Sequence, residues 1–128
     1  MIYEALGKTI GMRVLDDNGK IEITLQEQGK IFGIECSTTL TFVGKPEING
    51  VQYMEGYGIL VTKDGETATI TLNGRNIPKG LPPLAKFLGA VYMRTQSPKL
   101  SRLNSEVYMC EAEMKEDMTY MVKLWEWK

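Results

Sequence analysis

The chain has 128 residues, a length that suits one domain with a hydrophobic core of its own. Hydrophobic residues make up 43% and charged residues 24%, which excludes an intrinsically disordered chain. The 15 basic and 16 acidic residues leave a net charge of -1, so no overall charge attracts nucleic acid or an acidic membrane. We therefore expect one domain over residues 1–128 that binds neither of them.

The sequence contains no histidine, which excludes triads, Cys-His dyads and proton shuttles that depend on imidazole. Cys36 and Cys110 lie in strand-like runs. We interpret them as buried thiols, with a disulfide between two strands as the alternative. Two cysteines without histidine do not make a standard zinc site. We predict no metal and no cofactor, and no pattern identifies a catalytic residue.

The start of the chain, Met1 to Ala5, lacks the basic and apolar regions of a signal peptide. No apolar run approaches the roughly 18 residues of a membrane-spanning helix. These two observations lead us to expect a cytoplasmic protein.

Alternation of apolar and polar residues is the main structural signal. It is strict from Ile21 to Gln26, as in a strand with one face on the core. Lys8 to Leu15 is a second strand-like run, and Asp16-Asp17-Asn18-Gly19 lies between the two. Because Asn-Gly readily adopts positive φ, the sequence predicts a β-hairpin here.

Further strands are expected over residues 30–43, 51–62, 67–72, 89–95, 105–114 and 119–127. Lys63-Asp64-Gly65-Glu66 indicates a second hairpin turn. Residues 73–88 hold two glycines and three prolines, and they are predicted to form one long irregular loop. Such a loop is either a lid over a binding site or a plug across one barrel end.

Eight short strands joined mostly by hairpins predict an all-β fold, a single antiparallel barrel of about eight strands in meander order. Gly56 and Gly58 share one strand face, where a small barrel that curves sharply needs little side-chain volume. A barrel of this size either fills its interior with side chains or holds one small ligand.

The second half of the chain contains several distinctive short segments. It contains Gly56-Tyr57-Gly58, Thr95-Gln96-Ser97-Pro98-Lys99-Leu100 and a closing Trp125-Glu126-Trp127-Lys128. These segments resemble a small family of uncharacterised prokaryotic β-barrel proteins, similar in layout to calycins and to allene-oxide-cyclase-like barrels. The resemblance implies a barrel that holds an apolar ligand. The Gly-x-Trp signature of lipocalins is absent near the first strand, and no catalytic residue carries over.

Strand parity suggests where an internal ligand would bind. Glu55 and Tyr57 share a face of residues 51–61 that is otherwise apolar or aromatic, and Tyr92 and Arg94 share a face of residues 89–95. If both rows point inward, Glu55 and Arg94 form a buried pair, because a lone buried charge costs several kcal/mol. We predict Glu55, Tyr57, Tyr92 and Arg94 as ligand-binding residues. The alternatives are a purely structural pair, or a parity error that places both charges in solvent.

Other patterns have ordinary structural explanations. Glu111 and Glu113 lie on one strand face and are a candidate acid–base pair, although a solvated face is the commoner origin of this pattern. The loop residues Lys79, Lys86, Lys99 and Arg102 would either rim an opening or simply be solvated. Trp125 and Trp127 share a face that either closes the barrel or forms an outer apolar patch.

The predicted function is the binding of a small apolar or amphipathic molecule inside the barrel. One alternative is a cofactor-free isomerase or cyclase with Glu55 as its acid or base. Another is a non-catalytic interaction module that acts through its oligomeric surface. Apolar rows on both parities of several strands also predict a homo-oligomer, most simply a dimer.

Overall fold

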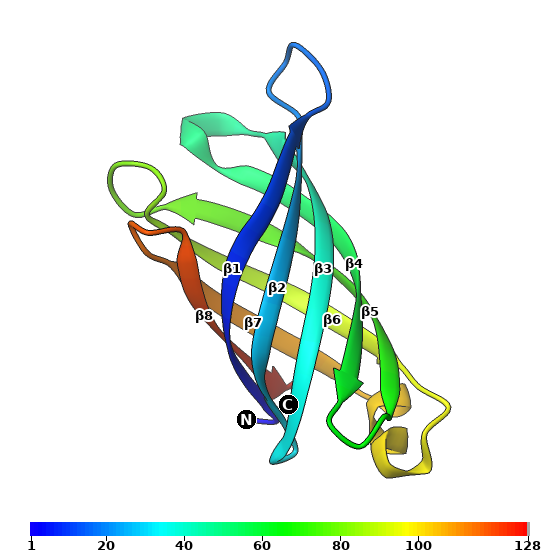
Figure 1. Cartoon of the computed structure of the whole chain (residues 1–128). Coiled ribbons are helices and arrows are strands. Elements are labelled where there is room, and N and C mark those ends of the chain that lie inside the picture. The colour runs from blue at the N-terminus through cyan, green and yellow to red at the C-terminus, as the bar shows by residue number, and fades with distance from the viewer. Residues whose placement is uncertain (128) are drawn as a thin grey trace.

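A computed structural model describes residues 1–127, which form eight strands and two short 3-10 helices (Figure 1). The elements are β1 (Tyr3–Val14), β2 (Ile21–Ile31), β3 (Ile34–Pro46), η1 (Ile48–Gly50), β4 (Gln52–Thr62), β5 (Thr67–Pro78), β6 (Ala85–Arg94), η2 (Pro98–Ser105), β7 (Val107–Met114) and β8 (Thr119–Glu126). Neither helix in this part of the chain has the length and apolar character needed to cross a membrane.

The strands form one closed barrel. Each strand pairs antiparallel with the next one in the chain, and β8 returns to pair with β1. Tyr3 in β1 is the partner of Ile31 in β2 and of Leu124 in β8, so three strands meet at this level. The predicted all-β barrel in meander order is confirmed.

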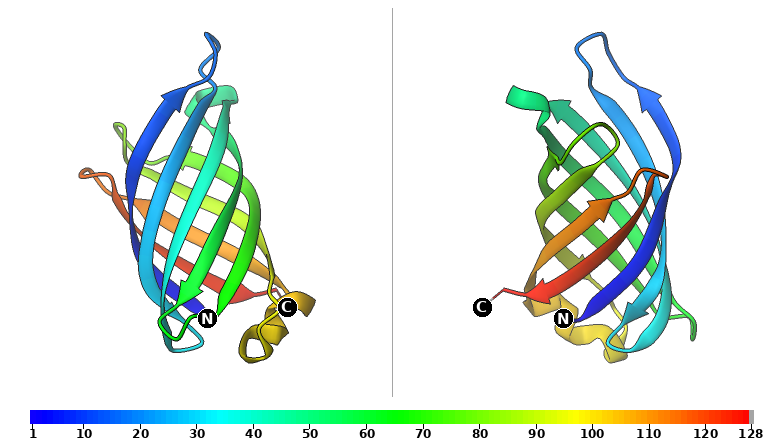
Figure 2. Two further views of the ribbon diagram at one scale, coloured as in Figure 1. Left: turned by 45° about the vertical axis from the view of Figure 1, so that its right-hand side comes forward. Right: turned by 90° about the vertical axis from the view of Figure 1, so that its left-hand side faces the viewer.

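The two ends of the barrel differ (Figure 2). Both termini and η2 lie at one end, and the β1–β2 hairpin projects from the other. Leu100 and Leu103 of η2 have no exposed surface, so this helix closes its end with apolar side chains. Arg102 places its guanidinium over the Phe32 ring, 4.6 Å from the centroid, and forms an ion pair with Glu126. These contacts tie the plug to the strands around it.

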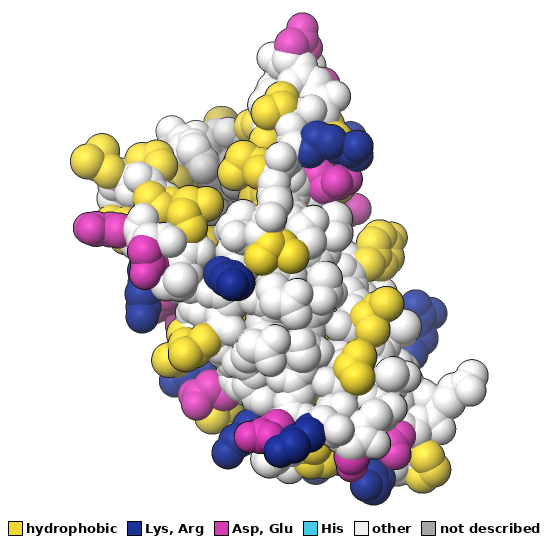
Figure 3. All heavy atoms as spheres, viewed as in Figure 1, with side chains coloured by type: hydrophobic (Ala, Val, Ile, Leu, Met, Phe, Trp, Pro, Cys, Tyr) yellow, Lys and Arg dark blue, Asp and Glu magenta, His cyan; other side chains and the backbone are white. Residues whose placement is uncertain are grey.

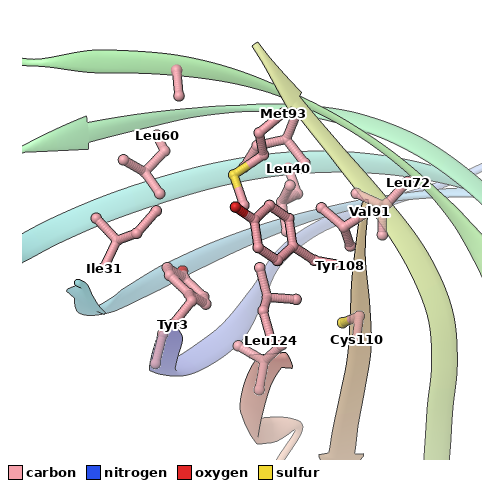
Figure 4. Close-up of a cluster of buried hydrophobic side chains, with 14 of the residues drawn as sticks. Tyr3, Ile31, Leu40, Leu60, Leu72, Val91, Met93, Tyr108, Cys110 and Leu124 are labelled. Carbon is pink, nitrogen blue, oxygen red and sulfur yellow. The ribbon is translucent and has the colours of Figure 1, made fainter. Parts of the chain in front are cut away.

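The core draws on all eight strands and on Leu100 and Leu103 of η2. Figure 4 shows side chains from opposite walls converging there, including Ile31, Leu60 and Tyr108, each without exposed surface. Cys36 and Cys110 are both buried free thiols, as the sequence indicated. A cluster that draws on every strand makes the barrel a single packing unit.

The long loop predicted over residues 73–88 is wrong in extent. Most of this segment belongs to β5 and β6, and only residues 79–84 are irregular. Gly74 and Gly89 are directly opposite each other, and a Cβ on Gly74 would lie 2.2 Å from the backbone oxygen of Leu88. The glycines that suggested a loop instead allow two strand backbones to approach closely. The loop is also not the plug, since η2 closes the opposite end.

The β1–β2 hairpin is confirmed and extends beyond the barrel wall. Asp16 Oδ1 accepts hydrogen bonds from the backbone N–H groups of Asn18 and Lys20, at 2.9 and 3.1 Å, and Gly19 has a φ of 90°. The pairing of β1 with β8 stops at Lys8, whereas its pairing with β2 continues to Val14. The outer half of the hairpin therefore stands clear of β8.

The outer face of the barrel differs from strand to strand: β2, β3 and β5 carry mostly polar side chains outward, whereas β4, β6 and β7 carry several exposed apolar ones. Gln26 and Gln28 on β2 both donate hydrogen bonds to Ser37 Oγ on β3. In Figure 3, uncharged polar side chains and backbone, drawn in white, cover the middle of the surface that faces the viewer. On β4, β6 and β7 the exposed large apolar side chains are Tyr57, Ile59, Val61, Leu88, Tyr92, Val107 and Met109. A second copy of the chain would cover this apolar face rather than the polar one.

Homo-oligomerisation stays a prediction. We expect a dimer in which this apolar face buries about 800 Å² per subunit, a standard specific interface. Light scattering coupled to size exclusion should give twice 14.4 kDa, and Tyr92→Glu should lower that mass. Thr24→Glu, on the polar side, is the matched control. A monomer mass throughout a micromolar dilution series would contradict the prediction.

Candidate functional site

The interior holds a cavity of about 110 Å³, lined from Ile23 and Phe87 toward one end to Leu60 and Met93 deeper in the core. Most of its lining is apolar and comes from all eight strands. Ile23, Leu25, Phe87 and Met114 line it and are only half-buried, so the cavity opens toward the end from which the β1–β2 hairpin projects. The polar side chains in its wall are Tyr3, Glu27, Asn76 and Tyr120.

Glu27 is a carboxylic acid in the barrel interior, with only 3% of its surface exposed. Tyr3 donates its hydroxyl to Glu27 Oε1, and Tyr120 donates its hydroxyl to Oε2, both at 2.6 Å. The Tyr3 hydroxyl also lies 2.9 Å from Thr38 Oγ1. Each carboxyl oxygen thus has one phenol partner, as a buried acid requires, and the distances are those of charge-assisted hydrogen bonds. Glu27, Tyr3 and Tyr120 are called the Glu27 cluster below.

Strand register brings the cluster together. Gly7 in β1 is the partner of Glu27 in β2 and of Tyr120 in β8. A Cβ on Gly7 would lie 2.3 Å from Tyr120 Cζ, because the tyrosine ring lies across the glycine. Only glycine at position 7 leaves room for the Tyr120 ring to reach the carboxyl group of Glu27.

Burial raises the pKa of the Glu27 carboxyl above its ordinary value, since an ionised acid loses its hydration there. The hydrogen bonds from Tyr120 and Tyr3 oppose this shift and do not reverse it. Burial likewise raises the pKa of both phenols, and the charge of Glu27 adds to the rise, so they stay protonated as donors.

Within residues 1–127, no basic side chain forms an ion pair with Glu27. The ion pairs of lysine and arginine among residues 1–127 all involve other carboxylates. The titratable groups nearest Glu27, apart from the two tyrosines, are the thiols of Cys36 and Cys110. Burial, with a contribution from Glu27, raises the pKa of Cys36 to about 11 and that of Cys110 above its usual range. Both thiols are therefore protonated and poor nucleophiles at neutral pH.

The predicted ligand-binding residues Glu55, Tyr57, Tyr92 and Arg94 do not line this cavity. All four are exposed on the outer face, and Tyr57 is 71% exposed. The assumption that their rows point inward is wrong, and the parity error we allowed for is what the structure shows. Tyr57 and Tyr92 do lie at one level, as both are partners of Thr71 in β5. A binding role for these four residues remains a prediction for the outer surface alone.

The physical reason is crowding inside the closed sheet. The inner row of β4 runs through Gly56 and Gly58 to Leu60, and a Cβ on Gly58 would lie 2.2 Å from Leu40 Cδ2. Because the interior lacks room for large side chains here, the bulkier row faces outward. The hydrophobicity of its two rows alone therefore predicts wrongly which face of β4 points inward.

The other candidate groups lie outside the barrel. Glu111 forms an ion pair with Lys86 at 2.7 Å, which fits a solvated strand face. Lys99 pairs with Asp64 at 2.7 Å beside the closed end. The four basic loop residues therefore do not rim one opening, since two of them belong to η2.

Sequence reasoning missed Glu27, although the signal was present. The alternating apolar row Ile21, Ile23, Leu25 continues to Glu27 and then to Gly29 and Ile31. Following the alternation beyond Gln26 would have placed one acid in a core-facing row.

The chain matches no protein-family model, and a search of curated proteins found no match. Among solved structures, it is similar to a protein with unknown function from Clostridium acetobutylicum, with a TM-score of 0.83 and 12% identity over 98% of this chain and 95% of that one. A conserved protein of unknown function from Rhodopseudomonas palustris has a TM-score of 0.80 and 11% identity, covering 98% and 93%. At these identities the likeness shows a shared fold.

We expect Gly7→Ala to destabilise the protein by about 1–3 kcal/mol, because the added methyl overlaps the Tyr120 ring and the core has little room to adjust. Gly11→Ala is the matched control on the same strand, since its Cβ would meet only Thr24 Cβ at 4.0 Å. Urea unfolding measures both. An equal loss in the two variants would show that the position of Tyr120 does not depend on Gly7.

The raised pKa of Glu27 predicts how stability changes with pH. The folded protein holds the Glu27 proton to a higher pH than the unfolded chain, whose glutamates titrate near 4.5. The contribution of Glu27 is therefore fully present below that pH and is lost as pH rises through the folded-state pKa. Wild type should lose about 1.4 kcal/mol relative to Glu27→Gln per unit of upward shift. Urea unfolding across pH 4 to 9 measures this, and a constant difference between the two proteins would contradict it.

Proposed function

We propose that this protein binds a small, mostly apolar molecule inside its barrel, with one polar group of the ligand against the Glu27 cluster. The observation that carries the proposal is an apolar cavity whose wall contains one buried, hydrogen-bonded carboxyl group. Ligand sites are typically apolar with a few polar groups that fix orientation. The proposed ligand site thus lies at Glu27, Tyr3 and Tyr120.

The size of the cavity limits the ligand. Its 110 Å³ compares with an engineered apolar cavity of about 150 Å³ that binds benzene. A single ring or a short branched chain is therefore the proposed occupant. Met12 pairs with Ile23 and Val14 with Ile21 on the projecting hairpin, so an apolar wall continues beyond the mouth. This wall supports an amphipathic ligand with a short tail.

The charge of a ligand further limits which class of molecule the site would accept. An anionic ligand would be repelled by an ionised Glu27, and no basic side chain among residues 1–127 forms an ion pair with this carboxyl group. Neutral molecules with a hydroxyl or carbonyl group, and small amines, avoid this repulsion. The layout resembles calycin and allene-oxide-cyclase-like barrels, and this resemblance also supports an internal ligand. We further propose a cytoplasmic location, where two free thiols stay reduced.

A non-catalytic interaction module is the second candidate, favoured by the exposed Tyr57 and Tyr92 on the outer face. It differs from the first in needing no cavity. The dilution series described above tests its oligomeric basis.

Ligand binding is tested by filling the cavity. We expect toluene, benzyl alcohol and cyclohexanone to bind wild type in saturation-transfer NMR, and benzoate not to bind. Ala112→Leu places a larger side chain in the cavity wall and should abolish binding. Ala90→Leu, on the outer face of the adjacent strand, is the matched control and should bind as wild type does.

Native mass spectrometry of protein purified from cells complements this test, because a retained small molecule identifies its own class. Equal binding by Ala112→Leu and wild type, or no binding by either, would contradict the proposal.

A further inference from the structure

The Glu27 cluster has a property that simple binding does not use. When Glu27 is ionised, the hydrogens of Tyr3 and Tyr120 both point to its oxygens. When Glu27 carries a proton, the hydrogens of Glu27, Tyr3 and Tyr120 share the two contacts between the carboxyl group and the phenols. One hydroxyl hydrogen must then find another acceptor.

The hydroxyl groups of the two tyrosines differ in whether a second acceptor is within reach. Tyr3 has Thr38 Oγ1 at 2.9 Å as a second partner. Tyr120 lines the cavity, and among the described residues its hydroxyl has Glu27 as its hydrogen-bond partner. If the Glu27 proton is on Oε2, it is donated to Tyr120, and the Tyr120 hydrogen is released toward the cavity. Protonation of Glu27 thus supplies a donor where a ligand oxygen would lie.

We propose that the cavity catalyses proton transfer at the carbon next to the carbonyl group of a small, mostly apolar ketone, with Glu27 as the base and Tyr120 as the donor to the ketone oxygen. The inference rests on the proposed function, since the ketone must bind first. It extends that function from holding a neutral ligand to moving the position of a double bond.

The steps balance without a co-reactant. Glu27 takes a proton from the α-carbon of a β,γ-unsaturated ketone, and the C–H electron pair forms a new C=C bond while the C=O π pair moves to oxygen. The protonated Glu27 then donates to Tyr120, whose own hydrogen bonds to the enolate oxygen. Glu27 returns the proton to the γ-carbon, which gives the conjugated ketone and restores the carboxylate.

The surroundings suit this chemistry. A base buried among apolar side chains works closest to neutral pH when its pKa is raised, as that of Glu27 is. A fixed donor in a site with little water stabilises a developing oxyanion more than water does. The titratable groups that face Glu27 are Tyr3, Tyr120, Cys36 and Cys110, and all four stay protonated at neutral pH. Glu27 is therefore the group in the cluster that accepts a proton.

The test follows the isomerisation of 3-cyclohexen-1-one to its conjugated isomer by ultraviolet absorbance, with binding measured separately by saturation-transfer NMR. Wild type should accelerate the reaction, and the rate should rise with pH through the folded-state pKa of Glu27. Glu27→Gln should lower the rate by about 10²-fold or more, the usual contribution of a general base. Tyr120→Phe should lower it by about 10²–10³-fold, the usual cost of losing an oxyanion donor.

Matched controls lie on the outer face. Glu35→Gln and Tyr53→Phe make the same chemical changes on the outer face, away from the cavity, and should keep the wild-type rate. Circular dichroism confirms that each variant is folded, and Ala112→Leu provides a variant that keeps the cluster and fills the cavity.

Each outcome decides the inference. Binding of the ketone without acceleration over Glu27→Gln overturns it and leaves the proposed binding function intact. Failure of the ketone to bind while toluene binds overturns it in the same way. Failure of every probe to bind contradicts both. Acceleration that is lost in Glu27→Gln, Tyr120→Phe and Ala112→Leu but kept in the two outer controls supports it.

Discussion

Closing eight strands into a ring leaves an interior only a few side chains wide, and most features of this protein follow from that limit. Where the sheet curves or two walls approach, the chain uses glycine, as at Gly7, Gly58 and Gly74. Space saved at Gly7 is taken by the Tyr120 ring, and space saved at Gly58 is taken by Leu40. Large side chains in the interior thus pack opposite glycines. The cavity is the space beside Glu27 that this packing leaves unfilled.

The same limit explains how an acid is tolerated inside the barrel. A buried carboxyl group without partners costs several kcal/mol, and a basic residue long enough to reach it would fill the cavity. Two phenols serve instead, because each brings a hydroxyl donor on a flat ring that packs against apolar neighbours. The acid keeps both oxygens hydrogen-bonded and still lines the cavity.

The sequence was sufficient for the fold and insufficient for the site. Alternation from Ile21 onward and the Asp16–Gly19 turn specify strands and hairpins locally, so the meander barrel was predictable. Which face of β4 points inward depends on contacts between strands, and its more hydrophobic row lies outside because Gly56 and Gly58 are needed within. The partnership of Glu27 with Tyr120 joins residues 93 positions apart, and only the closure of β8 onto β1 brings them together.

The plug formed by η2 has a kinetic consequence. With one end sealed by Leu100 and Leu103, any molecule that reaches Glu27 enters and departs through the same mouth. The proposed ligand would enter with its polar end first, and that end would lose its hydration beside the apolar Phe87 and Met114 before it meets the carboxyl group. Exchange of this proposed ligand would then be single-file, because a second molecule could enter only after the first had left. Residence time, rather than encounter frequency, then sets how fast the occupant turns over.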